Sequence, residues 1–144
     1  MKSIVLLSLL LGGFAQAQNV ILPAAKMEVG HYTGVDVESG TLNADVTLNA
    51  DKTLIFKLKS ADFEVPEPGC TGIYEEIGND VISDVTCPLE FLKQTKVRLD
   101  ITAVTYDSVR APEGVIIPVF VEAIGEDPIL FKMKLVEPAV VPVP

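Results

Sequence analysis

The sequence predicts an all-β fold: an antiparallel meander of about eight strands closed into a lipocalin-like barrel, with a β-sandwich as the alternative. Three observations carry this prediction. Apolar and polar residues alternate with a period of two along most of the chain, and no segment shows a long helical period. The two cysteines, Cys70 and Cys87, lie at equal distances on either side of the dipeptide Gly78-Asn79. Because no helices are expected to cover the strands, their inner faces must be buried against one another.

The N-terminal region predicts export. Met1-Lys2 is a short basic start, Ile4–Phe14 is an apolar run too short to span a bilayer, and Ala15-Gln16-Ala17 has the small-x-small form of a signal-peptidase site. We expect a signal peptide over residues 1–17 that is cleaved after Ala17, followed by a lead-in segment over 18–27. The mature protein would then be periplasmic or extracellular and would retain no membrane span.

A single β domain is expected over residues 28–136, and alternation defines its first three strands. We expect a first strand over residues 28–37 and a second over 42–50, in which the even positions are apolar and the odd positions polar. The third runs over residues 53–60, with Leu54, Phe56 and Leu58 facing inward. Asp51-Lys52 would join the second strand to the third in a tight connection.

The next two strands form a hairpin, and the cysteines indicate its register. A two-residue turn at Gly78-Asn79 suits type I′ or II′ geometry, which matches the twist of paired strands. Counting outward from the Ile77–Asp80 pair, Cys70 falls directly opposite Cys87 in a non-hydrogen-bonded pair, with Cα atoms about 4.5 Å apart. A disulfide can bridge that separation. We therefore expect a Cys70–Cys87 disulfide and an oxidising compartment.

The last three strands are expected over residues 95–104, 114–123 and 128–136. The first and third of these alternate apolar with charged or polar side chains, so each has one buried and one wet face. The segment 114–123 is apolar on both faces, which indicates either a strand covered on both sides or an interaction surface. Pro118 within it cannot donate to a β-ladder, and this favours an edge or bulge position.

The remaining segments are connections and a tail. One helical turn is expected over residues 88–93, because Pro88 suits a first helical position. Residues 61–69 and 105–113 are rich in loop-forming residues. The segment 137–144 alternates proline with valine and alanine, and we expect an extended, disordered tail there.

The charge of the chain restricts its partners. The formal net charge is −9 at pH 7. This argues against nucleic acid and anionic lipid surfaces, since both require clustered lysine and arginine. We interpret the acidity as favouring solubility.

The chain holds few residues that can perform catalysis. Its single histidine, His31, lies in the first expected strand and is predicted to face solvent or the barrel rim. Both cysteines are assigned to the disulfide, so no thiol nucleophile remains. The sequence contains no glycine-rich phosphate loop, no HExxH and no CxxC motif. We therefore expect neither catalysis nor a cofactor.

Carboxylates are the other candidates. On the outer face of the hairpin, Glu75, Asp80 and Asp84 alternate with isoleucines. Carboxylates at this spacing are candidate ligands for Ca²⁺, which takes several oxygen atoms, but they do not match the EF-hand pattern. We favour the alternative, a solvated strand face that resists edge pairing. Glu64 and Glu67 in the proline-rich loop allow the same two interpretations.

A signal peptide, a meander of about eight strands and one disulfide together resemble lipocalin-like (calycin) proteins. Many of these open their first strand with Gly-x-Trp, and Gly30-His31-Tyr32 occupies the comparable place here, with tyrosine for tryptophan. The disulfide departs from that pattern, since it joins neighbouring strands. The resemblance implies a barrel that binds a small apolar ligand inside.

Two functions remain open at this point. One is a secreted or periplasmic, non-catalytic barrel that encloses a small apolar ligand between side chains such as Val46, Phe56 and Leu99. The other is a structural or interaction module of the cell envelope that binds a protein through the apolar strand Val115–Val121. An enzyme is the third and least favoured possibility, because no set of nucleophile, base and metal ligands can be identified.

Overall fold

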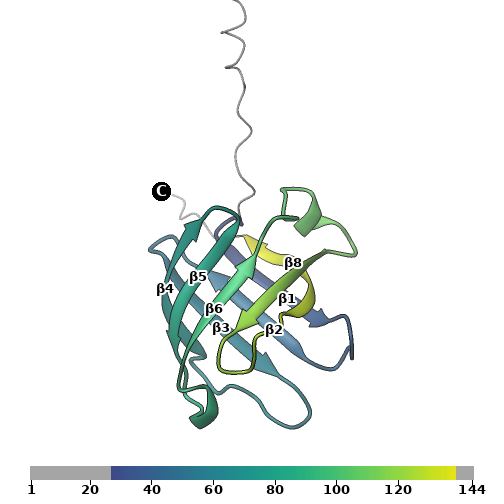
Figure 1. Ribbon diagram of the computed structural model, residues 1–144. Coiled ribbons are helices and arrows are strands. Elements are labelled where there is room, and N and C mark those ends of the chain that lie inside the picture. The colour runs from purple at the N-terminus through teal and green to yellow at the C-terminus, as the bar shows by residue number, and fades with distance from the viewer. Residues whose placement is uncertain (1–26, 139–144) are drawn as a thin grey trace, which may run out of the picture.

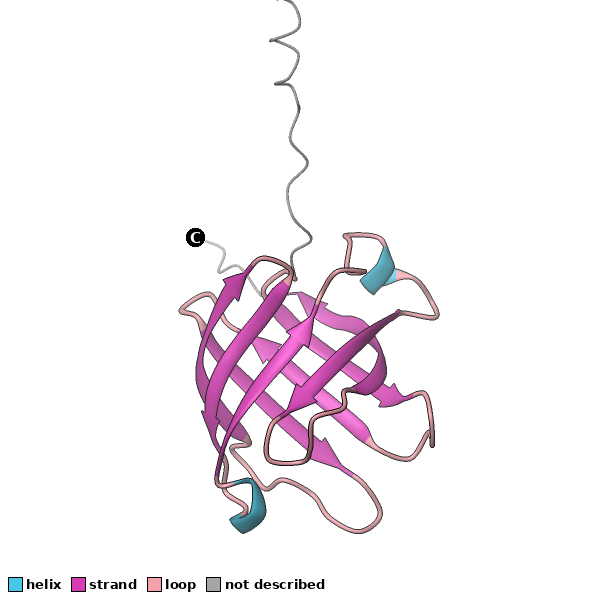
Figure 2. Ribbon diagram, in the orientation of Figure 1, coloured by secondary structure: helices cyan, strands magenta, loops and turns pink. Residues whose placement is uncertain are grey.

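Pairing between the first and last strands closes the sheet of this protein into a barrel. In the computed structural model, which describes residues 27–138, eight antiparallel strands follow one another in sequence order around the barrel (Figures 1 and 2). The strands are β1 (Gly30–Asp36), β2 (Asn43–Leu48), β3 (Thr53–Lys59), β4 (Cys70–Ile77), β5 (Asp80–Thr86), β6 (Gln94–Asp100), β7 (Val115–Val121) and β8 (Ile129–Pro138). The predicted fold is confirmed as the barrel. The predicted signal peptide lies outside the described residues.

The β1–β8 seam needs a close approach of the two backbones. A Cβ atom on Gly34 would lie 2.5 Å from the Lys132 carbonyl oxygen, so only glycine fits there. β8 continues to Pro138, because Glu137 and Pro138 pair with His31 and Gly30 of β1. β8 therefore ends two residues beyond the strand end expected at residue 136. Residues 139–144 lie outside the described part of the chain.

The hairpin has the register that its cysteines predicted. Ile77 pairs with Asp80 and Thr71 with Thr86, and the Cys70–Cys87 disulfide joins Cα atoms 4.0 Å apart. Between these rungs, a Cβ atom on Gly72 would lie 2.3 Å from the Asp84 carbonyl oxygen. The absence of a side chain at Gly72 therefore allows the two arms to stay in contact.

The interior is filled by side chains from every strand. The largest fully buried side chains are Tyr32, Phe56, Phe131, Leu48, Leu54, Leu58, Leu92, Leu99, Ile101, Ile117, Met133 and Val46. Most lie at alternate positions of the strands, as the period of two predicted. Leu92, at the end of the first 3₁₀ turn, η1 (Glu90–Leu92), is buried as well. This turn lies where a helical turn was expected.

The ladder between β6 and β7 is short, with three residue pairs from Val97–Val121 to Leu99–Val119. The Glu122 N–H donates to the Lys96 carbonyl, so Lys96 and Glu122 form a hydrogen-bonded pair. Hydrogen-bonded and non-hydrogen-bonded pairs alternate in an antiparallel ladder. The following hydrogen-bonded pairs would therefore be Arg98–Phe120 and then Asp100–Pro118. Proline has no N–H to donate, and the ladder ends there. β7 is nevertheless no edge strand, because Pro118 pairs with Leu130 of β8 on its other side. The sequence favoured an edge or bulge position, and the structure instead places the proline where the β6–β7 ladder stops.

The structure also corrects the expected end of β6. β6 stops at Asp100, whereas the sequence indicated a strand to residue 104. Ile101 and Val104 are buried all the same, because the turn after β6 folds their side chains over the core. The connection to β7 contains a second 3₁₀ turn, η2 (Ser108–Arg110), which the sequence did not predict.

A buried carboxylate organises the β1–β2 connection. Asp36 accepts hydrogen bonds from the backbone N–H groups of Ser39 (2.8 Å) and Leu42 (2.9 Å) and from the Ser39 hydroxyl (2.9 Å). Burial raises the pKa of the Asp36 carboxyl, but these hydrogen bonds outweigh it and the pKa lies below its ordinary value. The charged carboxylate is therefore the form that the fold stabilises.

We expect Asp36→Asn to lower the free energy of unfolding at neutral pH by about 1 kcal/mol or more, because the N–H groups of Ser39 and Leu42 lose a charged acceptor. Since the folded-state pKa is depressed, the wild-type contribution exists above the unfolded-state pKa and is lost as pH falls through the folded-state pKa. Urea unfolding between neutral and acidic pH should show that the variant lacks this acid-dependent component. Asp127→Asn, on an exposed loop, is the control at neutral pH.

We expect Gly72→Ala to destabilise the barrel by about 1–3 kcal/mol, because the added methyl group forces the two arms of the hairpin apart. Gly125→Ala is the matched control, since a Cβ atom there meets nothing within 4 Å. Urea unfolding of the two variants checks this. Equal stability of both would contradict the tight packing of the hairpin at Gly72.

Candidate functional site

The outer surface of β4 and β5 carries the carboxylates that the sequence singled out. We define the hairpin face as the six outward side chains of these strands, Ile73, Glu75, Ile77, Asp80, Ile82 and Asp84. Ile73 is 65% exposed and Ile77 is 55% exposed. The register places Glu75 opposite Ile82 and Ile77 opposite Asp80. Acidic and apolar side chains therefore alternate on this face, as predicted.

Two of these carboxylates pair with cations of β6. Arg98 Nη1 lies 3.2 Å from Asp80 Oδ1, and Lys96 Nζ lies 3.1 Å from Asp84 Oδ1. Both pairs are partly exposed, so each contributes about 0–1 kcal/mol. Among the described residues, Glu75 has no cationic partner, and no group of three or more His, Cys, Asp and Glu side chains is placed to hold a metal ion.

Arg98 also contacts an aromatic ring of the next strand. Its guanidinium lies 3.8 Å from the centroid of the Phe120 ring, which pairs with it across the β6–β7 ladder. Beside this contact is a cleft of about 280 Å³, whose lining includes Phe120, Glu122 and Gly125. Arg98 thus links the acidic hairpin to the strand that the sequence indicated as an interaction surface.

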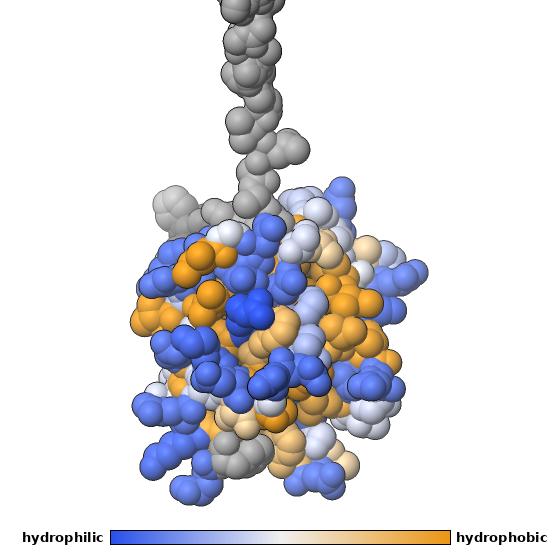
Figure 3. Space-filling view, viewed as in Figure 1, coloured by the Kyte–Doolittle hydropathy of each residue, from blue (hydrophilic) through white to orange (hydrophobic). Residues whose placement is uncertain are grey.

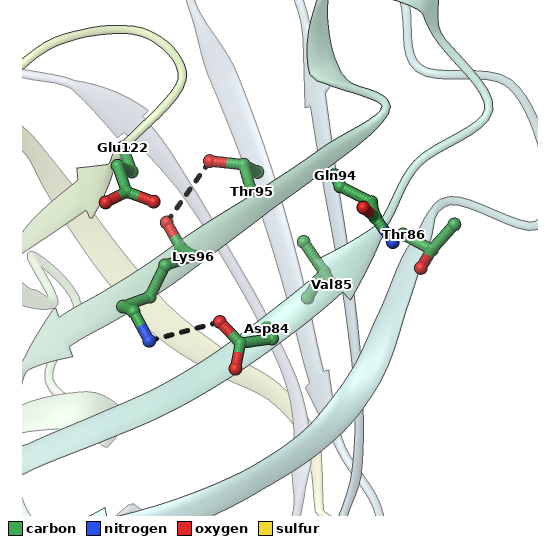
Figure 4. Close-up of a pocket in the computed structure, with 7 residues that line it drawn as sticks. All are labelled: Asp84, Val85, Thr86, Gln94, Thr95, Lys96 and Glu122. Carbon is green, nitrogen blue, oxygen red and sulfur yellow. Dashed lines mark hydrogen bonds and ion pairs between the residues drawn. The ribbon is translucent and has the colours of Figure 1, made fainter.

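A second cleft, of about 320 Å³, lies where β5, β6 and the end of β7 meet (Figure 4). Lys96 extends toward Asp84 along one side of it, and Glu122 projects from the neighbouring strand. The Thr95 hydroxyl oxygen accepts a hydrogen bond from the Ala123 N–H (2.8 Å), which holds the end of β7 against β6. The cleft offers charges of both signs, and Lys96 is already neutralised by Asp84.

His31 lies on the opposite side of the barrel, on the outer face of β1. Its Nε2 atom is 3.0 Å from Asp45 Oδ1, and both side chains are partly exposed. Close by, Lys57 Nζ is 2.5 Å from Glu67 Oε2, and this pair and the histidine line one cleft of about 340 Å³. Glu64 is exposed, and its backbone pairs with Lys59. The two carboxylates of the proline-rich loop therefore have separate surroundings.

One end of the barrel is tied by an ion pair that the sequence did not reveal. Arg110 of η2 donates to both carboxylate oxygens of Glu28, at 2.5 and 2.8 Å, and lies 3.7 Å over the ring of Tyr106. The Tyr32 hydroxyl donates to the Glu28 carbonyl oxygen at 2.7 Å. The hydrogen bonds from Arg110 lower the pKa of Glu28, and burial raises the pKa of Tyr32. This cluster joins the start of the domain to the β6–β7 connection.

A second outer face combines apolar side chains with lysines. We define the β8 face as the outward residues Val35, Ile116, Leu130, Lys132, Lys134 and Val136. The register sets Lys132 between Val35 of β1 and Ile116 of β7. Figure 3 shows apolar side chains gathered along the right-hand side of the molecule, where β7 lies. Sequence reasoning indicated β7 but did not identify the lysines as part of the same surface.

The lysines of the β8 face differ from those near the hairpin. Lys96 beside the hairpin, and Lys57 of β3 in the cleft with His31, have carboxylate partners, whereas Lys132 and Lys134 form no ion pair within the described residues. Ile116 and Leu130 beside them are 43% and 40% exposed. Two unneutralised cations on an otherwise acidic chain therefore lie among exposed apolar side chains.

We expect the Arg98 and Phe120 side chains to be coupled by about 0.5–1 kcal/mol, the range for a partly exposed cation–π contact. A double-mutant cycle with Arg98→Met and Phe120→Leu, followed by urea unfolding, measures the coupling. Because Asp80 also loses its partner in Arg98→Met, a parallel cycle with Asp80→Asn separates the two contributions. Additive effects of the Arg98 and Phe120 substitutions would contradict the contact.

Comparison with known proteins identifies no family for this chain. Among the described residues, no helix is both long and apolar enough to cross a membrane. The eight-stranded closed barrel is compatible with a lipocalin-like architecture. The chain matches no protein-family model, and no curated protein or solved structure matches it either.

Proposed function

We propose that this protein is a non-catalytic β-barrel module that binds a protein partner through the outer faces of its strands. The observation that carries the proposal is the distribution of its large apolar side chains. One set fills the barrel, and a second set remains exposed on the hairpin face and the β8 face. Binding at these faces would withdraw the second set from water, which is favourable.

The packing of the interior supports the external location of binding. Tyr32, Phe56 and Phe131 are each 0% exposed and belong to the same buried cluster. An eight-stranded barrel can be filled by its own side chains or hold one small ligand, and here these three rings lie in the interior. The enclosed apolar ligand that the lipocalin resemblance implies would have to displace these rings.

The grouping of the exposed apolar residues also supports binding at the outer faces. Single exposed apolar side chains are normal on protein surfaces, whereas contiguous ones mark interaction sites. Ile73 and Ile77 lie on the same outer face of β4, four residues apart, with Glu75 between them. Ile116 lies across from Lys132 on β8, next to the Pro118–Leu130 pair.

Export to the periplasm or the cell exterior forms part of the proposal. The disulfide between Cys70 and Cys87 suits an oxidising compartment. The signal peptide expected over residues 1–17 would deliver the chain there. In that setting the partner would be a protein of the cell envelope or its surroundings.

Titration of the isotope-labelled mature chain with benzene, a small apolar probe, tests where the protein binds apolar groups. We expect NMR shift changes at Ile73, Ile116 and Leu130 and none at inward residues such as Leu54. Saturable changes confined to inward residues would contradict the proposal and favour an enclosed ligand. The absence of any change on either outer face would contradict it too.

Phe131→Ala is the positive control, because it leaves an apolar void that can take up benzene. We expect this variant to show new shift changes at inward residues. The substitution costs about 3–5 kcal/mol, so Leu54→Ala serves as a second cavity variant if Phe131→Ala does not fold. The wild-type titration is informative whichever variant is used.

A further inference from the structure

The two apolar faces lie on opposite sides of the barrel. In a closed meander of eight strands, β4 and β8 are separated by three strands in either direction. The hairpin face is built on β4 and β5, and the β8 face is built on β8 and its neighbours β7 and β1. A partner bound to one face therefore leaves the other face free.

The two faces are complementary in charge and in spacing. On β4, Ile73, Glu75 and Ile77 point outward in turn, and Asp80 and Asp84 lie beside them on β5. On β8, the outward series is Leu130, Lys132, Lys134 and Val136. Outward side chains on a strand recur every two residues, about 6.6 Å apart. Glu75 can therefore face Lys132 or Lys134. In either register one flanking isoleucine of β4 meets an apolar side chain of β8, Leu130 or Val136, and the other lies beside the second lysine.

We propose that the β8 face of one copy of this protein binds the hairpin face of a second copy. This inference rests on the proposed function, for which it names the partner. Lys132 and Lys134 have no carboxylate of their own within the described residues, and Glu75 has no cation. Contact between copies supplies both with partners of opposite charge.

A symmetric pair of identical faces is disfavoured by the same charges. Two β8 faces in contact would bring lysines against lysines, and two hairpin faces would bring carboxylates against carboxylates. The remaining arrangement is heterologous, with different faces in contact. Because the two faces are on opposite sides of the barrel, each added copy presents a new free face and the assembly grows as an open row.

The association is expected to be weak and sensitive to salt. Two convex barrel surfaces with a few exposed apolar side chains each bury an area at the low end of specific interfaces, below about 1,200 Å² in total. The charge component is screened as ionic strength rises, since the Debye length shortens from about 10 Å at 0.1 M to about 3 Å at 1 M. Assembly should therefore require high local concentration and low salt.

Analytical ultracentrifugation of the mature chain, up to millimolar concentration at low salt, tests the proposal. We expect wild type to form a concentration-dependent series of species. Glu75→Lys, and separately the pair Lys132→Glu with Lys134→Glu, should each weaken association by roughly tenfold or more, because like charges then meet. The control variant carries Lys59→Glu and Lys93→Glu, at exposed lysines outside both faces. It has the same net charge as the variant with Lys132→Glu and Lys134→Glu, and it should associate like wild type.

Charge exchange supplies the decisive comparison. A chain that combines Glu75→Lys with Lys132→Glu and Lys134→Glu carries the opposite charge at each of these three positions, and its self-association should be restored. The chain that carries Glu75→Lys alone keeps a wild-type β8 face, so it should cap growing rows and lower the average mass when added to wild type. Far-ultraviolet circular dichroism of each variant verifies that the barrel is folded.

Wild type that remains monomeric at every concentration would overturn the proposed self-assembly. Equal loss of association in the Lys59 and Lys93 control, or failure of the exchanged chain to recover, would overturn the pairing of these two faces. Neither result alters the benzene titration, which reports whether the outer faces bind apolar groups at all. Monomeric wild type with benzene-responsive outer faces would mean that the partner is a different protein.

Discussion

Closure of the sheet through β1 and β8 is the constraint on which the rest of the structure depends. It removes the free edges that an open sheet would expose. It also divides each strand into side chains that fill the interior and side chains that face outward. Gly34 makes this closure possible, because a Cβ atom there would meet the Lys132 backbone at 2.5 Å. Packing of Tyr32, Phe56 and Phe131 in the core is a consequence of that closed geometry.

The parts of the fold that could be predicted from the sequence are those that local patterns control. The β4–β5 register followed from a two-residue turn and two equidistant cysteines, and strand positions followed from alternation. The end of β6 could not be predicted from alternation, because β6 stops where its last residue, Asp100, pairs with Asp80 at the start of β5. The end of β8 was missed for a similar reason, since Glu137 and Pro138 are ordered by pairing with β1.

The same distinction applies to the candidate surfaces. Alternation alone predicted that Glu75, Asp80 and Asp84 share one outer face. It could not show that Arg98 and Lys96 neutralise two of them, because that depends on the register of β5 against β6. Nor could it pair Glu28 with Arg110, which are 82 residues apart in the sequence. The unneutralised Lys132 and Lys134 became informative only once the ion pairs elsewhere were known.

The short ladder at Pro118 has a mechanical consequence for the whole barrel. Force or thermal motion that pulls strands apart meets the shortest ladder between β6 and β7, where three residue pairs join the two strands. On the other side of β6, its neighbour β5 is joined to β4 by a covalent link. The barrel wall is therefore reinforced covalently between β4 and β5, and it has its shortest ladder between β6 and β7, where Pro118 ends the pairing.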